Sequence, residues 1–269
     1  MSVHTLLIDG HVHIYPNFKI SAVLNGGIKR LSAYNLNEPR INILLLTERF
    51  DCNFFRQLTE DKNKKIDGFK IVNNDSNSAI ELENDKGQTL YIFAGRQIVT
   101  KEGLEINALA TALNITDRQF TADQVIQQIT DDGGIPVINW APGKWFSSRG
   151  KIVERLIKES SNKTFLIGDT SMRPTIWSTP RLMTLAKNRG FKIIAGSDPL
   201  PFDGEEEMVG TFGFMMQGEF DRNQPTESLR RLLLNPKTEC RIIGRRTSPV
   251  KFFRRQVKIM REKKQRSQD

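Results

Sequence analysis

The sequence contains few of the features that stabilise secreted proteins or anchor a chain in a membrane. It has only two cysteines, Cys52 and Cys240, which are too few for a disulfide framework. Its first residues lack the basic start and the apolar stretch of a signal peptide, and no apolar run approaches the roughly 20 residues of a membrane-spanning helix. We therefore expect a reducing, cytoplasmic setting and no transmembrane segment.

Most of the chain also lacks net charge. Residues 1–240 contain 29 basic and 29 acidic side chains, whereas residues 241–269 contain 11 basic and two acidic ones. The whole excess of +9 therefore belongs to the tail. This distribution indicates that any contact with nucleic acid or an acidic membrane surface is made by the tail.

The basic tail has the pattern of a helix. Ser248 is suited to cap it and Pro249 to occupy its first position. The apolar residues Phe253, Val257 and Met260 then recur at spacings of four and three, on one face. Two interpretations stay open. Either this stripe docks on the body and the basic residues face solvent, or the basic residues contact an anionic partner, nucleic acid or an acidic membrane surface.

The body alternates short apolar runs with helical patterns. Its length and a hydrophobic content of 38% suffice for one large core. Thr179, Pro180 and Gly190 mark the cap, the first position and the end of the clearest helix. About seven apolar runs separated by helices predict an α/β fold of parallel strands. We expect a single domain over residues 1–240, a distorted TIM-like barrel of seven strands, followed by a basic helical tail over residues 241–269.

Polar residues follow the predicted strands. Barrel enzymes keep their sites at the C-terminal ends of strands, so these positions are expected to face one opening. The six positions are His11, Glu48, Gln97, Asn139, Asp169 and Asp198.

Two of the three histidines lie two residues apart at the end of the first apolar run. In an extended strand His11 and His13 project from the same face, while Val12 projects from the other. Imidazole is a common ligand of divalent cations, so the pair predicts a metal site. The alternative is a polar strand end whose imidazoles are satisfied by hydrogen bonds.

The succession of motifs resembles the polymerase and histidinol phosphatase (PHP) superfamily over residues 5–203. These metal-dependent phosphoesterases are distorted seven-stranded barrels that hold up to three metal ions. The opening histidine pair matches His11-Val12-His13. The closing Gly-Ser-Asp-x-His is similar to Gly196-Ser197-Asp198-Pro199, in which the final histidine is missing.

Three motifs between these two depart from the family pattern. The sequence has Thr47-Glu48-Arg49 where the family has Thr-Asp-His, and Gly95-Arg96-Gln97 where it has Gly-x-Glu. Residues 134–143 resemble the segment that carries a His-Pro-Gly, but contain no histidine. The resemblance therefore implies a metal site that has lost several of its ligands.

The ligands that remain under this resemblance are His11, His13 and Asp198. Two imidazoles and a carboxylate are able to hold one divalent ion, Zn, Mn or Fe, with a position left for water. Glu48 would then serve either as a fourth ligand or as the group that accepts a proton from that water, and Asp169 is the other candidate acceptor. No organic cofactor is expected. Asp198 has a simpler alternative role, as a turn residue before a proline.

Basic side chains lie near the predicted strand ends, and one of them, Arg49, stands where the family pattern has a histidine. Guanidinium and ammonium groups bind phosphate through charge-assisted hydrogen bonds, so a small phosphorylated or anionic substrate is expected. For any single one of these residues the simpler interpretation, a solvated or salt-bridged loop residue, is favoured. The candidates are Arg49, Arg96, Lys144 and Arg173.

Two functions follow from these patterns. The first is a metal-dependent hydrolase, a phosphoesterase that uses a metal-activated water. The second is a catalytically inactive relative whose barrel serves as a scaffold for an anion, another ligand or a partner. Convergence of the ligands within about 2.0 to 2.3 Å of one point would favour the enzyme.

Overall fold

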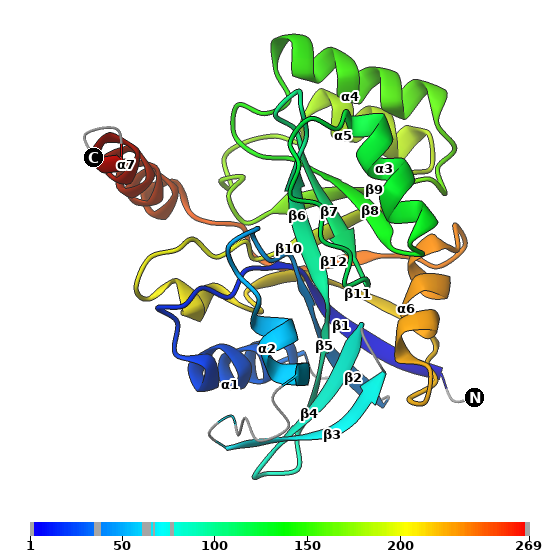
Figure 1. Cartoon of the computed structure of the whole chain (residues 1–269), viewed down its shortest axis with the longest axis vertical. Coiled ribbons are helices and arrows are strands. Elements are labelled where there is room, and N and C mark those ends of the chain that lie inside the picture. Colours follow the sequence, from blue (N-terminus) through cyan, green and yellow to red (C-terminus); the bar gives the residue numbers. More distant parts are fainter. Residues whose placement is uncertain (1–2, 35–38, 61–65, 67, 76–77, 267–269) are drawn as a thin grey trace.

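The structure is a computed structural model that describes residues 3–34, 39–60, 66, 68–75 and 78–266. Two β-sheets with helices packed around them make up the fold, and Figure 1 shows the larger sheet in the lower half of the molecule and the smaller one above it.

The larger sheet has seven strands and mixes parallel with antiparallel pairs. β1 pairs in parallel with β2, and β2 with β5, whereas the remaining neighbours are antiparallel. In spatial order the strands are β12 (Arg241–Gly244), β11 (Phe212–Glu219), β1 (Val3–Val12), β2 (Arg40–Leu46), β5 (Thr89–Phe93), β4 (Ala79–Asn84) and β3 (Phe69–Asp75).

The smaller sheet has five strands. Its first three members are parallel, and its last three are antiparallel. In spatial order they are β10 (Ile193–Gly196), β9 (Leu166–Thr170), β8 (Ile135–Asn139), β7 (Glu105–Leu109) and β6 (Gly95–Val99).

Helices cover the outer faces of both sheets, and apolar side chains fill the space between the sheets. None of the described helices is long and apolar enough to cross a membrane. The larger sheet is covered by α1 (Ile20–Leu31) and α2 (Phe54–Glu60), and the smaller sheet by α3 (Ala122–Asp131), α4 (Ser147–Glu159) and α5 (Arg181–Asn188). The core between the sheets is closed by α6 (Pro225–Leu234). The 3₁₀-helix η1 (Glu205–Met208) follows the loop after β10, and α7 (Pro249–Arg266) follows the loop after β12.

Local sequence signals place two of these helices correctly. α5 begins directly after Pro180, one residue later than predicted, and Gly190 follows it with a φ of +80°, which a residue without a Cβ adopts readily. At the start of α7, the hydroxyl of Ser248 accepts a hydrogen bond from the N–H of Lys251 at 3.3 Å. This is the predicted N-cap, which satisfies one of the unpaired N–H groups of the first turn.

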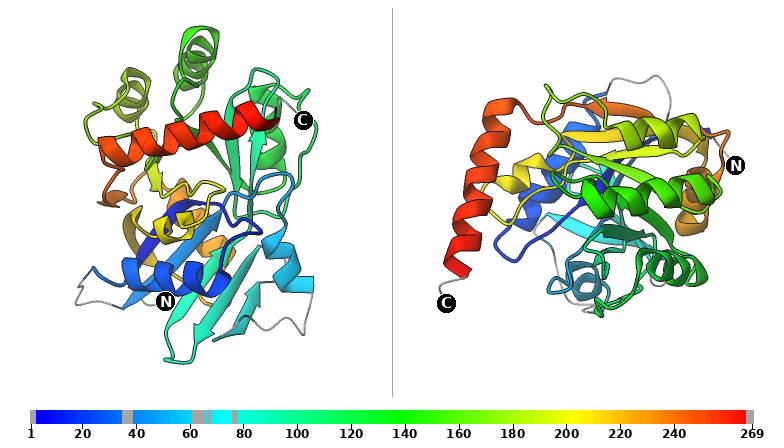
Figure 2. Two further views of the ribbon diagram at one scale, coloured as in Figure 1. Left: turned by 90° about the vertical axis from the view of Figure 1, so that its left-hand side faces the viewer. Right: turned by 90° about the horizontal axis from the view of Figure 1, so that it is seen from above.

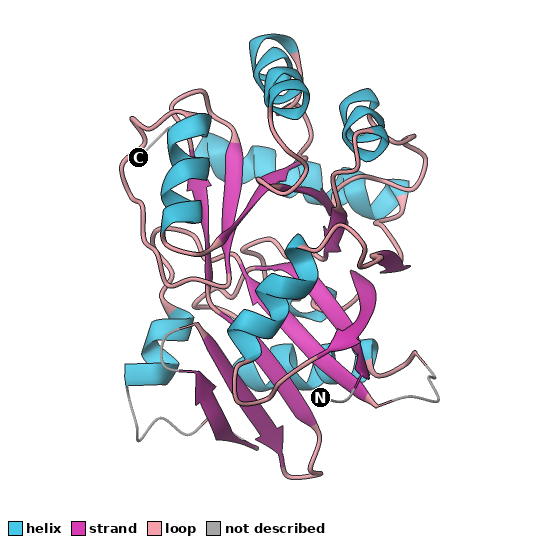
Figure 3. Ribbon diagram, turned by 90° about the vertical axis from the view of Figure 1, so that its right-hand side faces the viewer, coloured by secondary structure: helices cyan, strands magenta, loops and turns pink. Residues whose placement is uncertain are grey.

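The prediction of a seven-stranded TIM-like barrel is wrong. The described strands form two open mixed sheets rather than a closed barrel (Figure 3). A (β/α) barrel needs parallel strands joined by helices, but β6, β7 and β8 are antiparallel to one another. Only residues 100–104 join β6 to β7, and so short a connection returns the chain antiparallel because a parallel crossover needs about a dozen residues.

The two sheets touch where the ends of β1 and β10 cross. A Cβ on Gly10 would lie 2.8 Å from the carbonyl oxygen of Ala195, and one on Gly196 would overlap the backbone of His11. Nearby, the N–H of Asp198 donates to the carbonyl of His11 at 2.9 Å. Glycine at both positions therefore lets backbones from the two sheets come into contact, and this brings the end of the histidine strand beside Asp198.

α7 lies across one side of the molecule as its outermost element (Figure 2). The predicted docking stripe is wrong, because Phe253 and Met260 are 67% and 58% exposed. The helix instead docks through Phe252, whose ring contacts that of Trp177 at 5.4 Å, and through Arg255, which is 2% exposed. The periodicity correctly identified one apolar face but could not show that the opposite side of the helix is the one that packs.

Candidate metal centre

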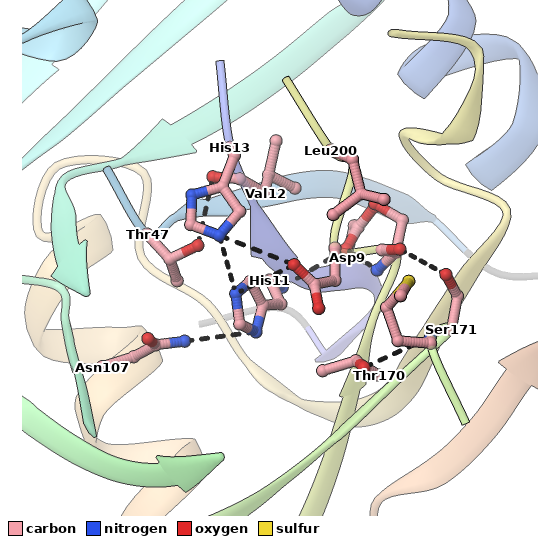
Figure 4. A network of polar contacts seen from close by, with 12 residues as sticks. Asp9, His11, Val12, His13, Thr47, Asn107, Thr170, Ser171 and Leu200 are labelled. Atoms are coloured by element: carbon pink, nitrogen blue, oxygen red, sulfur yellow. Dashed lines mark hydrogen bonds and ion pairs between the residues drawn. The ribbon is translucent and has the colours of Figure 1, made fainter. Parts of the chain in front are cut away.

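The three residues predicted as metal ligands lie together where the two sheets meet. The Nε2 atoms of His11 and His13 are 3.1 Å apart, and each is 3.6 Å from Oδ1 of Asp198. Figure 4 shows the two imidazole rings turned toward each other. Among the described residues these three form a group able to hold a metal ion.

The spacing of these atoms matches that of ligands to a single ion. A circle through three points that are 3.1, 3.6 and 3.6 Å apart has a radius of about 2.0 Å, so one point lies about 2.0 Å from all three ligand atoms. Zinc binds imidazole nitrogen and carboxylate oxygen at about 2.0 to 2.2 Å. The donor set and its geometry therefore fit one divalent cation.

The backbone fixes the direction of each ligand. β1 has a bulge between Asp9 and Val12, and such a bulge redirects the side chains that follow it. Asp198 follows β10 with a φ of +50°, a left-handed conformation that aspartate tolerates better than most residues. The hydrogen bond from its N–H to His11 holds this turn in place. Asp198 is thus both a turn residue, as its simpler interpretation held, and a member of the cluster.

Burial sets the protonation of His13. His11 and His13 are each 4% exposed, and burial lowers the pKa of His13 to about 3, with a further contribution from the neighbouring His11. A neutral imidazole is the form that binds a metal ion. The Asp198 side chain is 17% exposed, so the carboxylate lies on the side of the cluster that faces solvent.

Asn107 of β7 is a neighbour that the sequence did not single out. Its side-chain nitrogen lies 3.4 Å from Nδ1 of His11 (Figure 4), and its oxygen is buried without a partner among the described residues. If the amide turns over, this oxygen accepts a hydrogen bond from Nδ1–H of His11, which leaves the lone pair of Nε2 free for a cation. Metal-bound histidines usually have such a partner on their second nitrogen.

Asp9 was also missed, although a carboxylate inside an apolar run was a signal. It is fully buried and accepts hydrogen bonds from the N–H groups of Ser197 at 2.8 Å, Gly210 at 2.7 Å and His11 at 3.3 Å. Burial raises the pKa of Asp9 to about 6, although these hydrogen bonds act to lower it. The carboxylate ties β1 to the segments that follow β10 and precede β11, and so fixes the position of Asp198 relative to the histidines.

The two predicted proton acceptors do not join this cluster. Glu48 accepts hydrogen bonds from the N–H groups of Phe54 and Phe55, the first residues of α2, and burial raises the pKa of its carboxyl. Asp169 is 5% exposed and bonds to Arg173, with Nε 2.9 Å from Oδ1. Both carboxylates are committed to structural contacts.

Three of the four predicted anion-binding residues are also engaged elsewhere. Arg173 donates to Asp169 and to the carbonyls of residues 177 and 178. Arg96 donates to the carbonyls of Arg49 and Cys52 at 2.6 and 2.7 Å. Lys144 forms an ion pair with Glu105 at 3.1 Å. Lys144 and Arg173 therefore match the interpretation of salt-bridged residues, and Arg96 is held by backbone carbonyls instead.

Arg49 is the predicted anion-binding residue that lies beside the cluster. Its guanidinium sits 5.4 Å from the ring centre of Tyr15, and that ring stacks on His13 with centroids 5.6 Å apart. The charge of Arg49 also contributes to the low pKa of His13. Asp51 pairs with Arg49, whose side chain is 28% exposed. A partly exposed guanidinium therefore borders the cluster of His11, His13 and Asp198.

Comparisons with known proteins agree with the fold but give no family. No family model matches the sequence, and no curated protein does. Among solved structures, PsfC from Pseudomonas syringae PB-5123 matches with a TM-score of 0.59 and 14% identity over 100% of both chains. A two-domain protein from Bacteroides vulgatus, containing a predicted PHP-like metal-dependent phosphoesterase, matches with a TM-score of 0.43 and 16% identity, over 94% of this chain and 70% of that one. The chain shares the fold of PsfC, and its place in the PHP superfamily stays a prediction from the motifs.

Proposed function

We propose that the chain binds one divalent metal ion through His11, His13 and Asp198 and acts as a metal-dependent hydrolase of phosphoesters. The observation that carries this proposal is the convergence of the three ligand atoms on one point about 2.0 Å from each. Three protein ligands leave a position for water, and an ion held in this way lowers the pKa of that water to near neutrality.

The residues around the ligands supply position and charge. Asn107 fixes the ring of His11, and the low pKa of His13 keeps its imidazole neutral at ordinary pH. Arg49 is placed to bind a phosphate oxygen once its guanidinium exchanges Asp51 for the substrate. Because Glu48 and Asp169 are engaged elsewhere, the solvent-facing carboxylate of Asp198 takes the role of proton acceptor.

A neighbouring pocket indicates the kind of ester. It has a volume of about 670 Å³, and Tyr15 both lines it and stacks on His13. Phe18, Cys52 and Phe54 give the pocket an apolar lining, and Lys19 adds a charge. We infer a substrate with a phosphate group at Arg49 and an apolar or aromatic group in this pocket.

The test is metal content followed by activity. Protein purified without chelator should contain about one divalent ion per chain by elemental analysis. His11→Ala, His13→Ala and Asp198→Ala should each abolish this content, and hydrolysis of aryl phosphoesters should disappear with it. His4→Ala is the matched control, because it removes the remaining histidine at the far end of the same strand and should leave metal and activity unchanged.

Two or more stoichiometric ions would contradict the single-ion site, and no ion at all would contradict the metal proposal. A second candidate function is a ligand-binding scaffold without catalysis. It is favoured by the engagement of Glu48 and Asp169, which leaves the cluster without a separate base. One bound ion, with no hydrolysis but with phosphate binding that depends on Arg49, would support this alternative.

A further inference from the structure

The outer face of α7 carries apolar side chains in solvent. Val250, Phe253 and Met260 are 64%, 67% and 58% exposed, and Val257 between them is half-buried. Their spacings of three, four and three place them along one line of the helix. A surface helix normally turns such a stripe toward the protein, but here Phe252 and Arg255 on another side make the contact with the body.

A row of basic residues runs beside this apolar stripe. Arg254, Lys258 and Arg261 are exposed and recur at spacings of four and three, one position after the apolar residues. Among the described contacts, Arg254 and Arg261 take part in no hydrogen bond or ion pair, while Lys258 lies 5.5 Å from the ring centre of Phe202. The stripe and the row together form the outer face of α7, an amphipathic surface with apolar and cationic halves.

The outer face is preformed and accessible. Arg255 on the inner side is 2% exposed and bonds to Glu205 at 2.7 Å, so the helix is held to the body by a buried ion pair. Figure 2 shows α7 as the outermost element on its side of the molecule, so that a flat surface is able to approach along its length.

The chemistry of this face selects its partner. A bilayer with anionic lipids offers both a negative surface for the basic row and an acyl boundary for the apolar stripe. Nucleic acid would satisfy the basic row alone and leave Phe253 and Met260 in water. A second copy of the chain would bring together two tails that each carry the excess of +9, and their repulsion opposes such a pair.

We infer that α7 is an interfacial helix that lies on anionic membrane surfaces, with Val250, Phe253 and Met260 inserted at the acyl boundary and Arg254, Lys258 and Arg261 at the headgroups. The membrane binding is reversible, because one amphipathic helix does not anchor a protein as a spanning helix does. This inference is independent of the metal centre.

Co-sedimentation of the full chain with vesicles tests the inference. Phosphatidylcholine vesicles with about a third phosphatidylglycerol should bind the protein, and pure phosphatidylcholine vesicles should not. The triple variant Arg254→Gln/Lys258→Gln/Arg261→Gln should bind about a hundredfold more weakly, because each basic residue near an anionic surface changes the affinity about fivefold. The triple variant Val250→Ser/Phe253→Ser/Met260→Ser keeps its charge, and its affinity for the vesicles should fall by at least about tenfold.

Matched controls carry the same chemistry on other surfaces. Lys86→Gln/Lys101→Gln/Lys187→Gln removes three exposed charges, and Ile71→Ser/Val72→Ser removes exposed apolar groups; both should bind vesicles like the original protein. The inference would be overturned if a control variant lost as much vesicle affinity as the α7 variant that it matches. Full vesicle binding by the triple serine variant of α7 would overturn it too. Salt-sensitive binding to DNA without vesicle binding would assign the face to nucleic acid, and a dimer in solution that Phe253→Ser dissociates would assign it to a second copy.

Discussion

Arg255 of α7 donates a hydrogen bond from Nη2 to the backbone carbonyl of Asp198, with the two atoms 2.8 Å apart. The same nitrogen bonds to the buried carboxylate of Glu205 at 2.7 Å, and Nη1 lies 3.3 Å from the hydroxyls of Ser171 and Thr247. The C-terminal helix therefore holds the residue that supplies the carboxylate of the candidate metal centre. A tail that the sequence presents as a separate basic segment is in contact with the site.

Replacing Arg255 should both destabilise the protein and weaken the metal site. Arg255→Met leaves Glu205 buried without its cation, which costs about 3 to 5 kcal/mol when one partner of a buried pair is removed. Urea unfolding measures this loss, and a competitive chelator assay on the folded protein should show weaker metal binding. The double variant Arg255→Met/Glu205→Gln should regain part of the stability but not the metal affinity, because the hydrogen bond to Asp198 is still missing.

The control for this prediction is the next residue along the helix. Arg254→Met removes an exposed side chain and should change the free energy of unfolding by less than about 0.5 kcal/mol. Equal metal affinity in Arg255→Met and Arg254→Met would show that Arg255 does not position Asp198.

Asp169 and Arg173 should prove to be structural. Asp169→Asn leaves a buried guanidinium short of its counter-charge and should cost about 3 kcal/mol of stability. Asp169→Leu/Arg173→Met, which removes the pair together, should be less destabilised than the single variant. Metal content should stay at one ion per chain in both. Loss of hydrolysis in a folded, metal-loaded Asp169→Asn protein would instead return Asp169 to the role of proton acceptor.

Arg49 should govern anion affinity without affecting the metal. Arg49→Gln removes a charge-assisted hydrogen bond and should raise the concentration of inorganic phosphate needed for half-saturation by about tenfold or more. Asp51→Asn should have the opposite effect, because it frees the guanidinium from its partner. Isothermal titration with phosphate measures both. Arg56→Gln, which removes an exposed arginine from α2, is the control and should bind phosphate like the original protein.

Gly196 should tolerate no side chain. In Gly196→Ala the new Cβ would overlap the backbone of His11, so β10 must move away from β1 at a cost of about 2 kcal/mol or more. The displacement separates Asp198 from the histidines, and metal content should fall. Gly27→Ala is the control, since its Cβ would meet only side-chain atoms at 3.5 Å or more, within a helix that favours alanine. Thermal unfolding and elemental analysis of both variants check this prediction.

Much of the local structure could be predicted because its causes lie within a few residues. Pro180 and Gly190 bound α5, and Ser248 caps α7, through backbone hydrogen bonds and φ angles that neighbouring residues set. The separation of two residues between His11 and His13 likewise predicted that both would serve one site, and the structure places their rings in contact. The uneven distribution of charge is a property of the sequence alone.

The arrangement of the strands could not be predicted from neighbouring residues in the same way, and so a closed barrel could not be excluded. Apolar runs between helical patterns show that strands exist, but not which neighbour each strand takes or in which direction it runs. These depend on contacts between residues far apart in the sequence, such as the crossing of β1 and β10 at Gly10 and Gly196. The motif order led to the wrong closure because it does not fix strand direction, and β6, β7 and β8 are antiparallel to one another.

The roles of individual charged residues also depended on the tertiary structure. Glu48, Asp169, Arg96 and Arg173 have side chains suited to catalysis or anion binding, but burial makes an unpaired charge so costly that each is satisfied by a neighbour. The sequence by itself determined the candidate ligand types, the local helix signals and the location of the excess charge. The motif resemblance already named Asp198 beside the histidines, but only the folded chain decided that Glu48 and Asp169 are engaged elsewhere. Only the folded chain, too, decided which arginine of the tail holds Asp198, because that contact joins residues about 60 positions apart through packing between segments.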